Sequence, residues 1–136
     1  MGVPGEERLR GKGVSHCASC DAPLLRDKPV VVVGGGDSAA QEALTLAEAA
    51  SQVTILTDGA ALTAQTAFQA RIGESSKIEV RTDVEVAEIL GETGVEGVRL
   101  AGGGELEAAG VFIYVGLAPN TGFLDGLLEL DPSGRI

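Results

Sequence analysis

A buried strand that leads directly into a glycine-rich turn and then a helix constrains the fold of this chain most strongly. Val30–Val33 are four consecutive β-branched residues without polar alternation, which is typical of a strand covered on both faces in a parallel sheet. Gly34–Gly36 follow, and residues 38–50 consist mainly of strong helix formers. A second apolar strand is expected at residues 52–57, so the pattern predicts a β-α-β unit.

The remaining pattern predicts further strands and one weaker helix. Residues 61–72 are expected to be helical, with threonines lowering the propensity. Residues 78–81 and 111–115 are expected to form strands. Three alternating segments separated by glycine-rich turns predict an antiparallel meander over residues 84–90, 95–100 and 105–108. The predicted fold class is therefore α/β, with a Rossmann-like parallel sheet, helices on both of its faces, and a small antiparallel β-meander.

The glycine turn has the spacing of a dinucleotide-binding fingerprint, G-x-G-x-x-A, between a strand and a helix. The first glycine, Gly34, permits the sharp turn, and Gly36 lets the backbone approach a pyrophosphate. Ala39 allows the helix to pack close to the sheet, while Asp37 or Ser38 can cap it. Free N–H groups at the helix start are suited to binding an anion. The alternative is a tight turn that only connects a strand to a helix.

The end of the second strand bears on the choice of nucleotide. An acid at this place usually binds the ribose 2′-hydroxyl, whereas an arginine accommodates a 2′-phosphate. Thr57 and Asp58 occupy the position, and no Lys or Arg occurs from Pro29 through Ala70. The sequence therefore favours NADH over NADPH. Two alternatives stay open: Asp58 only begins a turn with the following glycine, or nucleotide binding has been lost.

The two cysteines, Cys17 and Cys20, lie three residues apart and can close a small disulfide loop. Such pairs often have a lowered thiol pKa where they begin a helix. Asp21 follows directly, and its carboxyl group can shuttle a proton to a leaving thiol. No metal site is expected, because a structural zinc ion usually needs four ligands and His16 is the only histidine. The alternative is a pair of inert buried thiols.

Composition excludes several classes of partner and location. The net charge is −10, from 20 acidic and 10 basic residues, which disfavours binding to nucleic acid or to an acidic membrane surface. The apolar runs are too short to cross a bilayer, and no signal peptide is expected. With two cysteines in one close pair, a cytoplasmic chain of one domain is the expectation.

Taken together, the motifs are similar to those of the low-molecular-weight bacterial thioredoxin reductases. The similarity covers nearly the whole chain and rests on residues 2–7, on Gly11–Asp21 with the two cysteines, on Gly34–Ala39, on residues 97–100, and on Gly116-x-x-Pro119-Asn120-Thr121.

The resemblance implies two nested dinucleotide domains, an FAD domain that is split in sequence and an inserted NADPH domain that carries the cysteines. This chain resembles only the inserted one. Its expected parts are an N-terminal segment with the redox cysteines (1–28), a pyridine-nucleotide-binding domain (29–115), and a segment leading to a missing FAD domain (116–136). No flavin fingerprint is present. FAD is therefore expected in the parent protein only, and the chain alone is expected to be inactive and colourless.

The resemblance also implies roles for single residues. NADPH reduces FAD, FAD reduces the cysteine disulfide, and the dithiol reduces a small thioredoxin-like protein. Cys17 attacks the partner disulfide, Cys20 lies nearer the flavin, and Asp21 is the general acid. The expected cofactor-binding residues are Gly34, Gly35, Gly36, Asp37, Ser38, Ala39, Thr57, Asp58 and Gly116. The parent is expected to be a homodimer whose domains rotate about residues 22–29 and 116–121.

Two departures from the family pattern leave alternatives open. The family's NADPH enzymes carry a His-Arg-Arg motif after the second strand, whereas residues 57–63 hold no cation. The related flavoprotein of alkyl hydroperoxide reductase uses NADH with a non-basic position there. Aromatic residues usually follow the cysteine motif, but Ala22–Leu25 contains none, which affects partner docking. The alternatives are a redox-sensing nucleotide-binding module, a reductase that serves a peroxidase, and a reductase fed by ferredoxin.

Overall fold

Two sheets and a layer of helices make up the body of the protein. The structure is a computed structural model that describes residues 1–124 and 126–136. Five parallel strands form sheet A in the order β1 (Val14–Ser15), β8 (Gly110–Ile113), β2 (Pro29–Val33), β3 (Gln52–Leu56) and β4 (Ile78–Arg81). Three antiparallel strands form sheet B, β5 (Val86–Leu90), β6 (Gly97–Leu100) and β7 (Glu105–Glu107). The helices are α1 (Ala18–Asp21), α2 (Asp37–Ala47) and α3 (Thr66–Glu74), with 3₁₀ turns η1 (Ala22–Leu25) and η2 (Gly122–Leu124).

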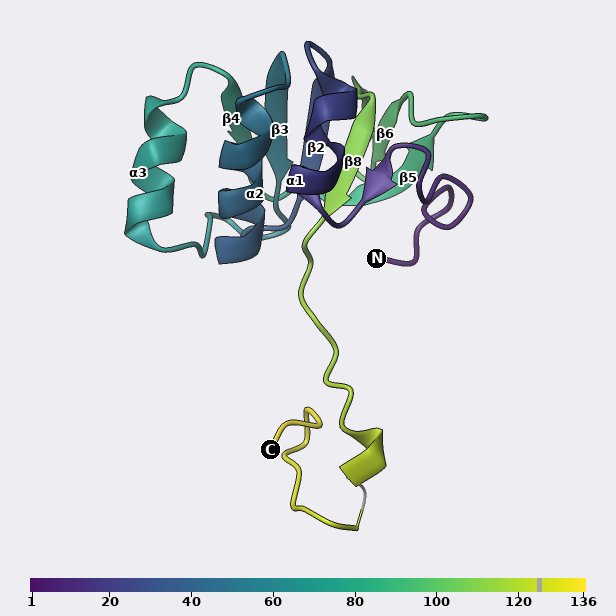
Figure 1. Cartoon of the computed structure of the whole chain (residues 1–136), viewed down its shortest axis with the longest axis vertical. Helices are drawn as coiled ribbons and strands as arrows, with labels where there is room; N and C mark the ends of the chain where they lie inside the picture. The colour runs from purple at the N-terminus through teal and green to yellow at the C-terminus, as the bar shows by residue number, and fades with distance from the viewer. Residues whose placement is uncertain (125) are drawn as a thin grey trace.

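The α/β class and the antiparallel meander are confirmed, but the helices lie on one face of sheet A only. Strand β2 is buried on both sides because its side chains alternate between two cores. Val30 and Val32 pack with residues of all three helices, whereas Val31 and Val33 pack with residues of sheet B. The expected second helical layer is absent from the described residues. The chain between β4 and β8 instead forms sheet B, which covers that face (Figure 1).

Helix α2 lies against sheet A through small residues, as its sequence predicts. Ala39, Ala43 and Leu46 recur at helical spacing and are fully buried. The helix ends at Ala47 rather than at residue 50, because its last turn tightens into i→i+3 bonds. Helix α3 begins five residues later than expected, at Thr66, because the preceding loop is hydrogen-bonded to the glycine turn.

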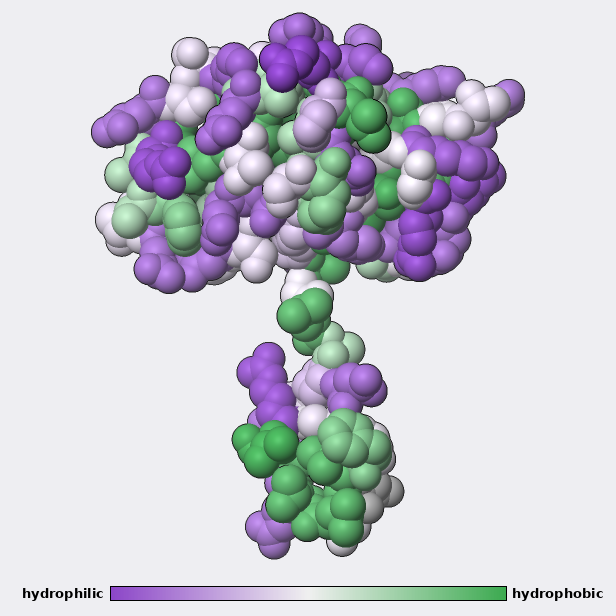
Figure 2. All heavy atoms as spheres, viewed as in Figure 1, coloured by the Kyte–Doolittle hydropathy of each residue, from purple (hydrophilic) through white to green (hydrophobic). Residues whose placement is uncertain are grey.

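The two ends of the chain differ in how they are packed. The N-terminal segment contributes β1 to sheet A, and its Leu9 and Val14 are buried in the same core as Val31. The described residues of the C-terminal segment, 116–124 and 126–136, extend away from the body (Figure 1) and carry a group of apolar side chains on their surface (Figure 2). Its exposed large apolar residues include Leu117, Phe123, Leu127, Leu128 and Ile136. None of the helices in the described part of the chain has the length and apolar character that a membrane crossing requires.

Candidate functional site

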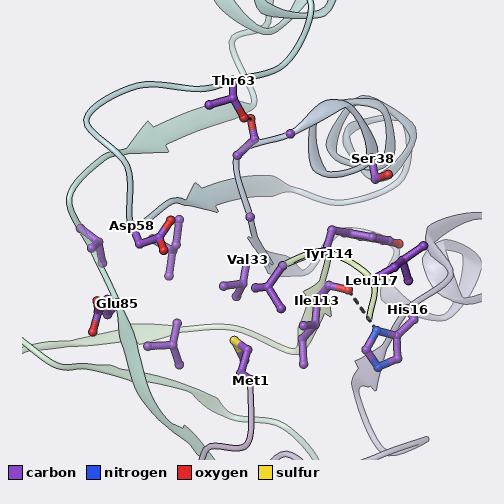
Figure 3. Close-up of a pocket in the computed structure, with 18 of the residues that line it drawn as sticks. Met1, His16, Val33, Ser38, Asp58, Thr63, Glu85, Ile113, Tyr114 and Leu117 are labelled. Atoms are coloured by element: carbon purple, nitrogen blue, oxygen red, sulfur yellow. Dashed lines mark hydrogen bonds between the residues drawn. The ribbon is translucent and has the colours of Figure 1, made fainter. Parts of the chain in front are cut away.

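The carboxyl ends of the parallel strands bring the candidate residues to one edge of sheet A. Gly34 follows β2, Asp58 lies two residues beyond β3, and Tyr114 follows β8. Together they line an open cleft of about 1060 Å³ (Figure 3). Open α/β sheets bind their ligands at this edge, in the crevice where strand order reverses. In this sheet β2 has β3 on one side and β8 on the other, so the cleft lies at such a reversal.

The glycine turn has the geometry that its sequence spacing predicts. Gly34 has φ +133°, and a Cβ there would lie 2.3 Å from the carbonyl oxygen of Tyr114, so only glycine fits. Gly36 has an ordinary φ of −87° and is the N-cap of α2 without a side-chain cap. A Cβ on Gly36 would meet only Thr63 Oγ1, at 4.0 Å. The turn therefore leaves open space in front of the helix N-terminus, which suits a phosphate group.

A hydrogen-bonded clasp holds the loop after β3 against this turn. The carbonyl oxygen of Gly35 accepts bonds from the N–H groups of Thr63 (2.8 Å) and Ala64 (3.1 Å). The Asp37 carboxylate accepts two bonds of 2.7 Å from Gln65, one from its backbone N–H and one from its side chain. These two bonds lower the pKa of Asp37. Asp37 lines the cleft, but its oxygens are engaged with the start of α3.

Thr57 and Asp58, in the loop after β3, differ in exposure. Thr57 is buried, its Oγ1 accepts the N–H of Gly59 at 3.3 Å, and it packs beneath Gly35. Asp58 is exposed and lines the cleft, and Glu85 lies nearby on the same side (Figure 3). Of the described residues that line the cleft, none is a lysine or an arginine.

The cysteines form a disulfide at a neighbouring place on the same sheet edge. Cys17 is the N-cap of α1, two residues beyond the end of β1, and is bonded to Cys20 with the two Cα atoms 5.3 Å apart. The N–H of Cys17 donates to Ser15 Oγ at 3.0 Å. Cys20 is exposed and Cys17 partly exposed. Neither cysteine belongs to the described lining of the cleft, so the disulfide is not part of the cleft wall.

Asp21 and His16 flank the disulfide on two sides. Asp21 ends α1, is partly exposed, and lines a second hollow together with Lys12 and Lys28. His16 lies between the disulfide and the main cleft, and its Nδ1 donates a hydrogen bond of 3.0 Å to the carbonyl of Ile113 (Figure 3). Within the described residues, no three His, Cys, Asp or Glu side chains are grouped as metal ligands.

The sequence predicts part of the cleft lining, but several of the lining residues were not among the predicted site residues. Gly34, Gly35, Gly36, Asp37, Ser38, Asp58 and Gly116 line the cleft, whereas Thr57 and Ala39 are buried behind it. His16, Glu85 and Tyr114 also line it and were not expected there. Tyr114 could have been identified, since it lies near the end of the strand predicted over residues 111–115. Glu85 gave no such signal.

The structure is an α/β domain with a glycine-turn cleft and an accessible disulfide at one edge of its parallel sheet. The pyridine nucleotide-disulphide oxidoreductase family matches residues 1–136, and the chain belongs to this family. It is similar to a thioredoxin reductase of Dictyostelium discoideum, with 43% identity over all of this chain and 45% of the relative. It is also similar to an alkyl hydroperoxide reductase component of Staphylococcus aureus, with 37% identity over all of this chain and 28% of the relative.

Solved structures agree with the sequence comparisons. The thioredoxin reductase of Lactococcus lactis superposes with a TM-score of 0.91 and 37% identity, covering 98% of this chain and 46% of that one. The chain therefore spans less than half the length of these relatives. The similarity to the thioredoxin reductases expected from the motifs is confirmed.

Proposed function

We propose that this chain is the nucleotide-binding and disulfide-bearing domain of a flavoprotein disulfide reductase. In this proposal residues 29–115 bind a reduced nicotinamide nucleotide, residues 1–28 carry the redox cysteines, and residues 116–136 connect to a flavin domain. The observation that supports it best is the pairing of a glycine-turn cleft and an accessible disulfide on one edge of one parallel sheet. We expect the parent protein to be a cytoplasmic homodimer.

The residues of the cleft fit the nucleotide. In the proposed complex the pyrophosphate lies at Gly36 and the first turn of α2, where the backbone leaves space and the helix dipole favours negative charge. Ser38, in the first turn of α2, also lines the cleft (Figure 3), and its hydroxyl can donate to a phosphate oxygen. Gly116 also lines the cleft. It has φ +107° and no atom within 4 Å of an added Cβ, so it leaves space for the nucleotide.

We propose NADH as the preferred nucleotide. Asp58 is suited to accept bonds from the ribose 2′-hydroxyl. A 2′-phosphate would instead meet the carboxylates of Asp58 and Glu85 without a lysine or arginine from the described lining. Like charges at close range are destabilising, so binding of NADPH should be weaker.

The proposed disulfide chemistry gives roles to Cys17, Cys20 and Asp21. Two electrons and two protons convert the disulfide into Cys17 and Cys20 thiols; NADH provides both electrons and one proton, and solvent provides the other. The Cys17 thiolate then attacks one sulfur of the partner's disulfide, forming a mixed disulfide and releasing a partner thiolate. Cys20 attacks Cys17 to release the second partner sulfur. Asp21 donates the proton that a leaving thiolate takes up.

When bound, a flavin would supply the two-electron relay between the nucleotide in the cleft and the disulfide. This chain has one dinucleotide turn, so we assign the flavin to the remaining polypeptide of the parent. The exposed apolar side chains of residues 116–136, including Leu117 and Phe123, support this assignment, because apolar surface of this kind is usually covered by other protein.

The test uses the full-length parent protein with NADH, NADPH and an oxidised thioredoxin-like protein. We expect disulfide reduction that is faster with NADH at limiting nucleotide. Failure with either nucleotide would contradict the reductase proposal and favour a redox-sensing module. Preference for NADPH would contradict only the assignment of Asp58.

A second candidate partner is a peroxidase disulfide. The observation in its favour is the 37% identity to the alkyl hydroperoxide reductase component of Staphylococcus aureus across the whole chain. Running the same assay with an oxidised peroxidase in place of the thioredoxin-like protein distinguishes the two, since the preferred partner will give the higher kcat/KM.

A further inference from the structure

A carboxylate on a different helix is bonded to the first free N–H of the cysteine helix. The N–H of Ala18 donates to Glu42 Oε2 at 3.2 Å, joining α1 to α2. Ala18 is fully buried and follows Cys17 directly. Free N–H groups at this position ordinarily stabilise the thiolate of an N-terminal cysteine. Here the N–H that follows Cys17 is occupied by a side chain that carries a negative charge.

Tyr114 lies close enough to Glu42 for the carboxylate to affect the pKa of its phenol. Its hydroxyl oxygen is buried and makes no hydrogen bond with the described residues. Burial first, and then the charge of Glu42, raise the pKa of Tyr114 to about 12. The phenol is therefore neutral at physiological pH. A charge held in partly buried surroundings acts on its neighbours more strongly than one in open solvent.

We infer that Glu42 is a positioning residue that holds the cysteine helix on α2 and disfavours the thiolate form of the reduced cysteines. The inference rests on the proposed function, in which Cys17 and Cys20 are the working dithiol. Its consequence is a dithiol that stays protonated to higher pH than a cysteine pair at an unblocked helix start. Glu42 does not touch the sulfur atoms in any bond of the structure and acts through α1.

Other charged groups around α1 are kept constant in the test. They are Asp21 at its end, His16 before it, and Lys12 and Lys28 beside Asp21. The informative variant is Glu42→Gln, because the amide oxygen can still accept the Ala18 N–H while the charge is gone. Glu48→Gln is the matched control, since Glu48 is an exposed carboxylate immediately after the same helix.

The experiment measures the thiol pKa of the reduced 136-residue chain, from thiolate absorbance and from the rate of alkylation by iodoacetamide against pH. We expect Glu42→Gln to lower the pKa of the more reactive thiol by about half a unit or more, which gives about threefold faster alkylation near pH 7. Glu48→Gln should match the wild type. An unchanged thiol pKa in folded Glu42→Gln would overturn the inference.

A second variant keeps the inference testable if Glu42→Gln does not fold. Glu42→Asp keeps the charge but withdraws it from Ala18, so it should lower the thiol pKa in the same direction by a smaller amount; no change, or a rise, would also overturn the inference. The measurement needs no nucleotide, flavin or partner protein. A failure of the full-length protein to reduce a thioredoxin-like disulfide would therefore leave this result intact and contradict only the proposed function.

Discussion

Replacing Gly36 by alanine should separate nucleotide binding from stability. An added Cβ meets only Thr63 Oγ1, at 4.0 Å, and φ is −87°, so the backbone accepts alanine without strain. Loss of unfolded-chain entropy favours alanine by about 0.4–1 kcal/mol, and the poorer N-cap costs a similar amount. We therefore expect the free energy of unfolding to change by less than about 1 kcal/mol.

The same methyl group should weaken the nucleotide complex. It projects into the space where the proposed pyrophosphate contacts the start of α2. Loss of one hydrogen bond to a charged phosphate oxygen costs about 1.5–3 kcal/mol, which corresponds to about tenfold to hundredfold weaker binding. Isothermal titration calorimetry with NADH measures the affinity, and thermal unfolding measures the stability of the same preparation.

The comparison variant is Gly35→Ala. Its Cβ would lie 2.6 Å from Thr57 Oγ1, so overpacking should destabilise the fold by about 1–3 kcal/mol. Wild-type affinity for NADH in a stable Gly36→Ala protein would refute the reasoning, because the pyrophosphate could not then lie at this turn.

Three further outcomes are expected. Gly34→Ala should lower the thermal midpoint more than Gly36→Ala does, because φ +133° and the carbonyl of Tyr114 exclude a Cβ; an equal midpoint would contradict this. Cys17→Ser in the full-length protein should abolish reduction of the partner disulfide but leave flavin reduction by nucleotide intact, as followed by flavin absorbance; loss of both activities would indicate a structural cysteine. The Asp37 carboxylate has a lowered pKa in the fold, so it stabilises the protein above its ordinary pKa of 3.8 and less as pH falls through the folded value. In urea unfolding, the free energy of unfolding of Asp37→Asn should therefore fall less than that of the wild type as the pH is lowered through that acidic range.

The strands of the nucleotide unit were predictable because their sequences agree with their surroundings. Val30–Val33 are apolar on both faces, and β2 is covered on both faces. Gly34 and Gly36 have the conformations that the fingerprint requires. The start of α3 was not predictable, because residues 61–65 have no strong local signal and are held by Gly35 and Asp37, which are distant in sequence.

Features that depend on pairing between distant segments were not predictable from the sequence. The N-terminal segment gives no strand pattern, yet β1 pairs with β8 across almost a hundred residues. The covering of one sheet face by the meander also depends on packing rather than on local pattern. Glu42 was part of the helix predicted over residues 38–50, and only its contact with Ala18 reveals its relation to the cysteines.

The most direct test of the proposed electron path is rapid mixing of the oxidised full-length protein with NADH in the absence of oxygen. Flavin absorbance and free thiols are followed together, with this 136-residue chain as the comparison. We predict that the flavin is bleached first, that two thiols per chain then appear, and that the 136-residue chain yields none. Thiols appearing in that chain with NADH alone would contradict this path.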